Sequence, residues 1–181
     1  MGLEVRGVDE LKAKLDAVAA RARDLTPVLT VAAQDTRTLI DDSFAGSTTP
    51  ENRPWAPLAD STVARRRQGS SVPLVDTANL RNSITAYGRG TSLKFGSSAP
   101  YAAPHQFGFA RSGQLKNRSY RLGVKREAGT PWTTRVPARP FLPVAGGGAA
   151  GYSLMTQGNA GAHWTYVRNA VRTYIATGRV T

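Results

Sequence analysis

Four short segments constrain the fold of this chain most strongly, because between them they hold proline and glycine, which fix backbone shape, beside large aromatic and polar side chains. They are residues 53–62 (RPWAPLADST), 74–84 (LVDTANLRNSI), 101–108 (YAAPHQFG) and 136–142 (VPARPFL). None of them holds a set of acid, base and nucleophile. The four segments therefore predict contact surfaces on rigid loops and not an active site.

The chain has the length of one domain. Of its 181 residues, 40% are hydrophobic and 20% charged, close to the average of globular proteins, and its 18 glycines and 11 prolines predict long loops. We expect an α+β fold in which N-terminal amphipathic helices pack on a small antiparallel β-sheet. In this interpretation residues 1–144 form the α+β domain, residues 145–161 a glycine-rich linker, and residues 162–181 a C-terminal helix and tail.

Two helices are predicted over residues 9–44. In the first, apolar residues recur every three or four positions, the pattern of an amphipathic helix, at Leu11, Leu15, Val18, Ala22 and Leu25. Asp9 is the expected N-cap of this helix, and Thr26 is that of the second, with Pro27 in its first turn. The second helix runs to about Phe44, and the turn-forming residues 46–50 end it.

The hydrophobic period changes to that of strands after residue 50. Ile84, Ala86, Leu93 and Phe95 alternate around a turn at residues 88–90, which predicts a β-hairpin with one buried face.

Residues 109–135 are polar and basic, and we expect a surface loop or a projecting hairpin there. Within this stretch Tyr120, Leu122 and Val124 indicate a short strand.

The last part of the chain is expected to be a helix at the end of a tether. Residues 145–151 (AGGGAAG) are too rich in glycine to hold regular structure. A helix follows at about 162–176, with Gly178 as its stop. One face of this helix is apolar, formed by Trp164, Val167, Val171, Tyr174 and Ile175.

The charge of +12 is unevenly distributed. Residues 1–45 carry six basic and eight acidic residues, whereas the remainder carries 18 basic and four acidic residues, so the two parts have net charges of −2 and +14. A field of this size attracts polyanions or acidic protein surfaces. The loop-rich part is therefore the candidate for such contacts.

A run of three arginines closes a segment that is suited to a short helix. Two interpretations stay open for it, a solvated charged face and an electrostatic contact with nucleic acid or an acidic neighbour. The chain has no helix-turn-helix, zinc-finger or RNA-stacking motif, so contact with nucleic acid would reach backbone phosphates. The candidate DNA-facing or lumen-facing residues are Arg65, Arg66, Arg67, Arg111, Lys116, Arg118, Arg121, Lys125 and Arg126.

The residues needed for catalysis are largely missing from the sequence. The absence of cysteine excludes disulfides, thiolate catalysis and cysteine-based zinc sites. The two histidines, His105 and His163, are expected to be hydrogen-bonded structural groups. After residue 45 the only acids are Glu51, Asp60, Asp76 and Glu127, which are far apart in the sequence. We expect no enzymatic activity, no cofactor and no metal.

Two further interpretations concern a local cap and the membrane. Asp76 and Thr77 resemble a helix N-cap before residues 78–81. No apolar run approaches the roughly 20 residues that cross a bilayer, and the N-terminus has no signal-peptide pattern. We therefore expect a soluble protein, made in the cytosol, with no membrane partner.

Two features are suited to packing or to subunit contact. Trp55, between two prolines, is a rigid aromatic anchor, either a plug under a loop or part of a subunit interface. Pro137 and Pro140 favour an extended backbone that presents Arg139 and Phe141 at a fixed spacing. The candidate interface or loop-locking residues are Trp55, Arg81, Tyr101, His105, Gln106, Arg139, Pro140 and Phe141.

The four segments, in this order and at these spacings after a helical N-terminal part, resemble the phage virion morphogenesis, or tail completion, family. The resemblance covers roughly residues 30–144. The sequence departs from the family pattern where Ala78 replaces the usual glycine after Asp-Thr, at Pro104, and at residues 51–53 before Pro-Trp.

The resemblance implies a non-enzymatic structural protein of a tailed phage or phage-like particle. It implies a homo-oligomeric ring at the head–tail junction of the virion, and the symmetry of tails makes a hexamer the expected form. During assembly the protein is expected in the host cytoplasm. The implied partners are the head connector or adaptor and the tail-terminator or tail-tube proteins. We further expect the basic part to line the lumen, where it contacts passing DNA, or to face the connector. The alternative is a nonspecific nucleic-acid-binding module that acts through the same basic part.

Overall fold

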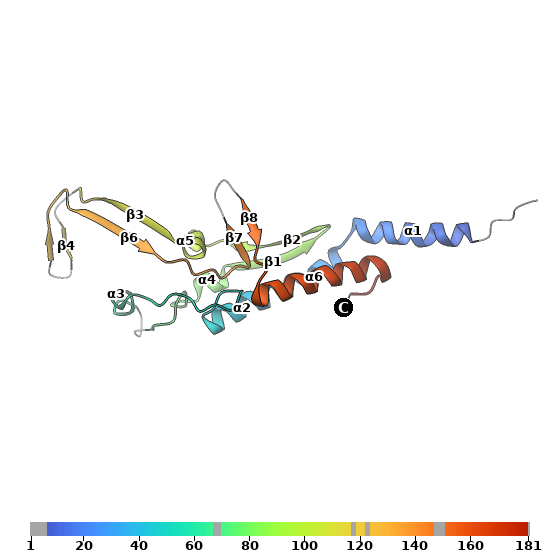
Figure 1. Cartoon of the computed structure of the whole chain (residues 1–181), viewed down its shortest axis with the longest axis horizontal. Helices are drawn as coiled ribbons and strands as arrows, with labels where there is room; N and C mark the ends of the chain where they lie inside the picture. The colour runs from blue at the N-terminus through green and yellow to red at the C-terminus, as the bar shows by residue number, and fades with distance from the viewer. Residues whose placement is uncertain (1–6, 67–69, 117–118, 122–123, 147–150, 181) are drawn as a thin grey trace, which may run out of the picture.

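A computed structural model describes residues 7–66, 70–116, 119–121, 124–146 and 151–180. Over these residues the protein has the expected α+β architecture, with helices at the N-terminus, antiparallel β-hairpins and a C-terminal helix. The molecule is elongated, with one helix extending from one end and a long hairpin from the other (Figure 1). Among the predicted features, Arg67, Arg118, Leu122 and the glycines within 147–150 lie outside the described residues.

The first two helices form as predicted, but with different caps. Helix α1 spans Val8–Arg23 with Gly7 as N-cap at φ 88°, so Asp9 lies in the first turn. Helix α2 spans Thr26–Gly46 with Leu25 as N-cap, and it ends at Ser47 in a left-handed conformation. Neither N-cap residue makes a side-chain cap hydrogen bond, which is why a search for capping side chains placed both starts wrongly.

Helix α2 is the centre of the fold. Strands β1 (Ile84–Arg89) and β2 (Ser92–Ser97) form an antiparallel hairpin that packs on it, and helix α6 (Gly158–Thr177) lies along it. A Cβ at Gly88 would lie 2.3 Å from the backbone of Leu29, so only glycine lets β1 approach α2 this closely. The buried residues of α2 are Val28, Leu29, Ala32, Ala33, Thr36, Leu39, Ile40, Ser43 and Phe44.

The predicted hairpin is present with a shifted turn. Arg89 pairs with Ser92, so Gly90 and Thr91 make the turn, and Gly88 belongs to β1. Ile84 is buried, and Leu93 and Phe95 are half-buried against the cluster that α6 forms with α2. The alternation of apolar residues therefore identifies the buried face correctly, while the glycine at 88 serves a close approach and not a turn.

The region before α6 is more regular than its composition suggests. Strand β7 (Val144–Gly146) pairs with β8 (Tyr152–Leu154), which corrects the expectation that residues 145–151 hold no regular structure. Gly146 adopts φ 84° in this hairpin. Helix α6 then begins at Gly158, earlier than predicted, and ends at Gly178 as predicted. Ala160, Trp164, Val167 and Ala170 are its buried residues. The division of the chain into domain, linker and tail stays a prediction.

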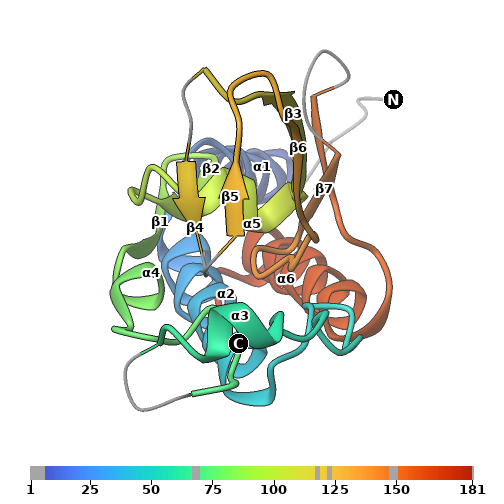
Figure 2. The ribbon, with the colours of Figure 1, turned by 90° about the vertical axis from the view of Figure 1, so that its left-hand side faces the viewer.

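The stretch 109–135 forms the projecting hairpin that the sequence allowed. Strands β3 (Phe109–Gln114) and β6 (Pro131–Val136) pair along its length, and β4 (Ser119–Arg121) pairs with β5 (Val124–Arg126) at its tip. We call residues 109–136 the arm. It extends away from α1 and α6 in the side view (Figure 1), and in the end view its tip strands β4 and β5 lie nearest the viewer (Figure 2).

Three short helices lie in the loop-rich part, α3 (Asp60–Val63), α4 (Asn79–Asn82) and α5 (Ala102–Phe107). The N-cap of α4 is Ala78 at φ 58°, and no side chain caps this helix, so the predicted cap at Asp76 and Thr77 is wrong. A left-handed backbone strains any residue with a Cβ. This strain fits the departure at Ala78, where the resemblance leads us to expect glycine.

We expect the substitution Ala78→Gly to raise the free energy of unfolding by about 0.5–1 kcal/mol, since the relieved left-handed strain exceeds the chain entropy that glycine adds. Ala64→Gly is the matched control, because Ala64 has an ordinary φ of −60° and also lies at the end of a short helix. The control should lose stability in urea unfolding. An equal loss in both variants would contradict the assigned backbone strain.

Candidate functional site

The four segments of the sequence meet in one apolar cluster on α2. Phe44 of α2 is the centre of its aromatic part, with its ring 5.5 Å from that of Trp55 and 5.5 Å from that of Phe141. Phe141 is fully buried. Each segment contributes at least one side chain, and the whole cluster is Ile40, Phe44, Trp55, Leu74, Leu80, Ile84, Ala102 and Phe141.

Gln106 of α5 holds the last of these segments in place. Its Oε1 accepts hydrogen bonds from the backbone N–H groups of Phe141 and Leu142, both at 3.0 Å. Its Nε2 donates to the carbonyl oxygens of Leu142 at 3.1 Å and Val144 at 2.9 Å. The side chain is only 2% exposed, so all four hydrogen bonds lie in a low-dielectric interior, where losing one leaves a costly unpaired group.

Trp55 and Arg139 fasten the same segment to residues 55–57. The indole Nε1 of Trp55 donates to the carbonyl of Pro140 at 2.7 Å. The guanidinium of Arg139 donates from Nε to the carbonyl of Ala56 at 2.6 Å and from Nη2 to that of Pro57 at 2.7 Å. Both side chains therefore join two segments of the same chain, and Trp55 is buried. Whether these residues also take part in a subunit contact stays a prediction.

Arg139 is a buried cation, 5% exposed. Burial, and then the positive charge of Arg66, lower the pKa of its guanidinium. No carboxylate forms an ion pair with Arg139 among the described residues. Its charge is instead distributed over backbone carbonyls, which fixes the loop geometry at the cost of desolvating an unpaired cation.

Glycine ends the 101–108 segment for a spatial reason. Gly108 has φ 66°, and a Cβ there would lie 2.7 Å from the backbone nitrogen of Ala138. The backbone of Arg139 also donates to the carbonyl of His105 at 2.8 Å. The last turn of α5 and the 136–142 segment are therefore in direct backbone contact.

Arg81 links α4 to α2 through an ionic network that the sequence did not reveal. Its Nε donates to Asp41 at 2.8 Å, and Arg37 donates to the same carboxylate at 2.9 Å and to the carbonyl of Arg81 at 3.1 Å. Burial raises the pKa of Asp41, but the hydrogen bonds and charges of both arginines outweigh it and hold the pKa below its ordinary value. The only sequence signal is the i,i+4 spacing of Arg37 and Asp41, which does not indicate the distant partner.

The two histidines lie in different places. His163 of α6 contacts Thr36 of α2, with Nε2 and Oγ1 2.9 Å apart, as expected of a structural imidazole. His105 lies edge-on to the exposed ring of Tyr101, and its Nδ1 is buried with no hydrogen-bond partner in the described part of the chain. Burial, and then Arg139 and Arg66, lower the pKa of His105, and burial lowers that of His163.

We call the apolar cluster on α2, with the hydrogen bonds of Gln106, Trp55 and Arg139, the locked core. A pocket of about 700 Å³ opens beside it. Its walls come from α3, α4, α5 and the base of the arm, and they combine apolar side chains such as Leu58 and Pro137 with charged ones. Among the residues that the structure describes, three arginines (Arg66, Arg135 and Arg139), His105 and one carboxylate, that of Asp76, line it. The sequence reasoning singled out Arg66, His105 and Arg139 separately, without placing them in a common cavity.

The basic candidates divide between the locked core and the arm. Arg65 is exposed after α3, whereas Arg66 folds back and donates from Nη1 to the carbonyl oxygens of Ser70, Val72 and Val75, with 3.0 Å for Val75. Arg111, Lys116 and Arg126 are exposed on the arm, and Arg121 and Lys125 lie in β4 and β5. Whether these residues face DNA, a lumen or a neighbouring protein stays a prediction.

Two features are absent from the residues that the structure describes. No group of three or more His, Asp or Glu in these parts of the chain is arranged to hold a metal ion. Within the same residues, no helix combines the length and the apolar character that a membrane span requires.

Comparison with known proteins identifies the family. The model of the phage virion morphogenesis family matches residues 7–174, nearly the whole chain. The chain belongs to the phage virion morphogenesis family. It is also 29% identical over 140 residues to the Mu-like prophage FluMu G protein 2 of Haemophilus influenzae, with 77% of this chain and 81% of that protein covered. No solved structure matches the chain.

Membership gives the locked core its context. A phage virion morphogenesis protein contributes to building the virus particle. The match begins at residue 7 and ends at 174, so α1 and most of α6 belong to the family pattern together with the four segments. The resemblance drawn from residues 30–144 is confirmed, and the family extends beyond them on both sides.

We expect the substitution Arg139→Met to lower the free energy of unfolding by about 2 kcal/mol, because methionine keeps the apolar stem but leaves the carbonyls of Ala56 and Pro57 unpaired. Arg135→Met is the matched control, since Arg135 is exposed on the same side of the pocket. It should change stability by about 0.5 kcal/mol or less. Equal effects in urea unfolding would contradict the locking role of Arg139.

Proposed function

We propose that this protein is a tail-completion or head–tail joining protein that assembles as a ring, with a hexamer as the expected form, at the head–tail interface. Membership of the phage virion morphogenesis family supports a role in building the tail region of the particle. The ring, its position and its contacts with head-connector and tail-terminator or tail-tube proteins are part of the proposal.

The observation that carries this proposal is the shape of the molecule. A body locked by Gln106, Trp55 and Arg139 bears α1 at one end and the arm at the other (Figure 1). A closed ring needs each subunit to present two different surfaces, one to each neighbour. A rigid body with unlike ends meets that requirement, and a preorganised body loses little entropy when it binds.

The second candidate function, nonspecific binding of nucleic acid, is supported by the arm. Arg111, Lys116, Arg126 and Arg135 are exposed there. Contacts to backbone phosphates need such exposed cations, and they do not require side chains that recognise particular bases. In a ring the same residues would face DNA in the lumen or an acidic neighbour, so the arm is compatible with both candidates.

The proposal is tested by deleting the gene from the phage or prophage that encodes it and examining the particles by electron microscopy. We expect heads and tails that fail to join, and joined particles again when the wild-type gene is supplied in trans. Normal particles without the protein would contradict the proposal. The alternative would be favoured if the purified protein remained a small species and retarded DNA in a strongly salt-dependent way.

A further inference from the structure

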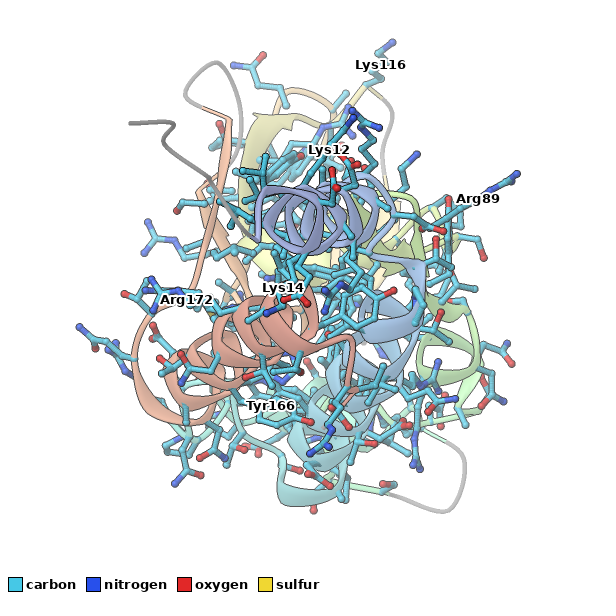
Figure 3. All side chains as sticks on the ribbon, turned by 90° about the vertical axis from the view of Figure 1, so that its right-hand side faces the viewer. Lys12, Lys14, Arg89, Lys116, Tyr166 and Arg172 are labelled. Atoms are coloured by element: carbon cyan, nitrogen blue, oxygen red, sulfur yellow. The ribbon has the colours of Figure 1, made fainter. Side chains whose placement is uncertain are left out.

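Helix α1 has an apolar face that the described residues leave exposed. Val8, Leu11 and Leu15 are 55%, 58% and 58% exposed, and α1 contains no buried residue. Its main contact among the described residues is with α6, which lies beside it (Figure 3). Arg21, near the C-terminal end of α1, lies beside Gly178 at the end of α6. An isolated helix of this length is marginal in water without packing of its apolar face. The face therefore needs a cover in the assembled state.

The pocket beside the locked core carries an excess of positive charge that no acidic group offsets among the described residues. Among its described lining residues, three arginines outnumber one carboxylate, and Arg139 is held there by hydrogen bonds to backbone carbonyls alone. The charges of Arg66 and Arg139 both lower the pKa of His105 and so favour its neutral form. Its Nδ1 has no hydrogen-bond partner among the described residues, which favours the tautomer with the proton on Nε2, because an unpaired acceptor costs less than an unpaired N–H. The pocket thus offers cations and donors to an anionic group.

A carboxylate on a protruding protein segment fits this pocket better than a phosphate of duplex DNA. Arg139 is recessed, and Arg66 is half-buried, so a broad duplex would meet the rim before reaching them. The walls also include apolar side chains, Leu58, Pro137 and the exposed Tyr101, which match an amphipathic segment. The first turn of α1 carries both properties, with Asp9 and Glu10 beside Val8 and Leu11.

We propose that the first turn of α1 from one copy docks in this pocket of the next copy, with the carboxylates of Asp9 and Glu10 facing its arginines. The pocket is lined by α3 and α4, at the end of the molecule opposite to α1, so the two surfaces cannot meet within one chain (Figure 1). The contact is head-to-tail, as a ring requires. The inference rests on the proposed ring and names the surfaces that build it.

The chain lacks cysteine, so a cross-linking test has no background. Full-length Val8→Cys protein is mixed with full-length Thr62→Cys protein and treated with a short bismaleimide. Thr62 is an exposed residue of the pocket wall. Mixing Val8→Cys with Asn169→Cys, an exposed position on α6, is the control. We expect the first pair to form cross-linked dimers about tenfold faster than the control, as a specific complementary contact would.

Charge reversal makes the test specific. Adding Asp9→Lys and Glu10→Lys to the Val8→Cys chain should remove the excess cross-linking, and Arg135→Glu in the Thr62→Cys chain should restore part of it. Asp16→Lys, on the same helix, is the matched control and should have little effect.

Three outcomes would overturn the contact. The first is equal cross-linking of both pairs. The second is Val8→Cys homodimers as the main product, which would indicate pairing of two α1 helices. The third is a loss of DNA retardation in Arg135→Glu without any change in cross-linking. Rings seen by microscopy together with equal cross-linking would discard this contact and keep the proposed function. Excess cross-linking that responds to charge reversal, with heads and tails joined normally after gene deletion, would keep the contact and discard the proposed function.

Discussion

The side-chain amide of Gln106 is the interaction on which the rest of the structure depends. An amide that is 2% exposed must find partners for its donors and acceptor, and the backbone of residues 141–144 supplies all of them. Once this backbone is fixed, Phe141 lies in the core against Phe44, and the carbonyl of Pro140 accepts from Trp55. A polar network thus determines where the apolar residues pack.

This arrangement explains how a chain rich in loops has a defined shape. The helices and the hairpin β1–β2 form a conventional layer, but the pocket and the base of the arm rest on segments with little regular structure. Side-chain bonds to backbone carbonyls take the place of strand pairing there. The result is a body whose two ends, α1 and the arm, project in opposite directions (Figure 1). Its family is one of phage virion morphogenesis.

Much of the fold follows from the sequence, because hydrophobic period reports burial directly. It located α1, α2, the faces of β1 and β2, and α6. The polar, basic composition of residues 109–135 indicated a surface loop or a projecting hairpin, and the hairpin is present. The caps at Gly7, Leu25 and Ala78 could not be found in this way, since they rest on backbone conformation without a side-chain bond. The strand at 144–146 was missed because glycine content indicates freedom, whereas Gly146 uses that freedom to make a hairpin.

The candidate site shows the same limit. Composition singled out Trp55, Gln106 and Arg139 as loop-locking or interface residues, and the structure places all three in the lock. Their partners are backbone groups more than 30 residues away in the chain, which no local pattern encodes. The pocket was not predicted because its walls come from segments that are distant in the sequence. The exposed apolar face of α1 was not predicted because an amphipathic pattern does not indicate what covers the apolar side.

Native-state hydrogen exchange at two backbone amides tests the central claim most directly. The N–H groups of Phe141 and Leu142 donate to Gln106 and belong to a segment without a helix or strand. If the lock organises the fold, these amides exchange only through global unfolding and are as protected as that of Ile40 in α2. Exchange at the rate of an exposed loop, while α2 stays protected, would show that the segment opens independently and would contradict the account.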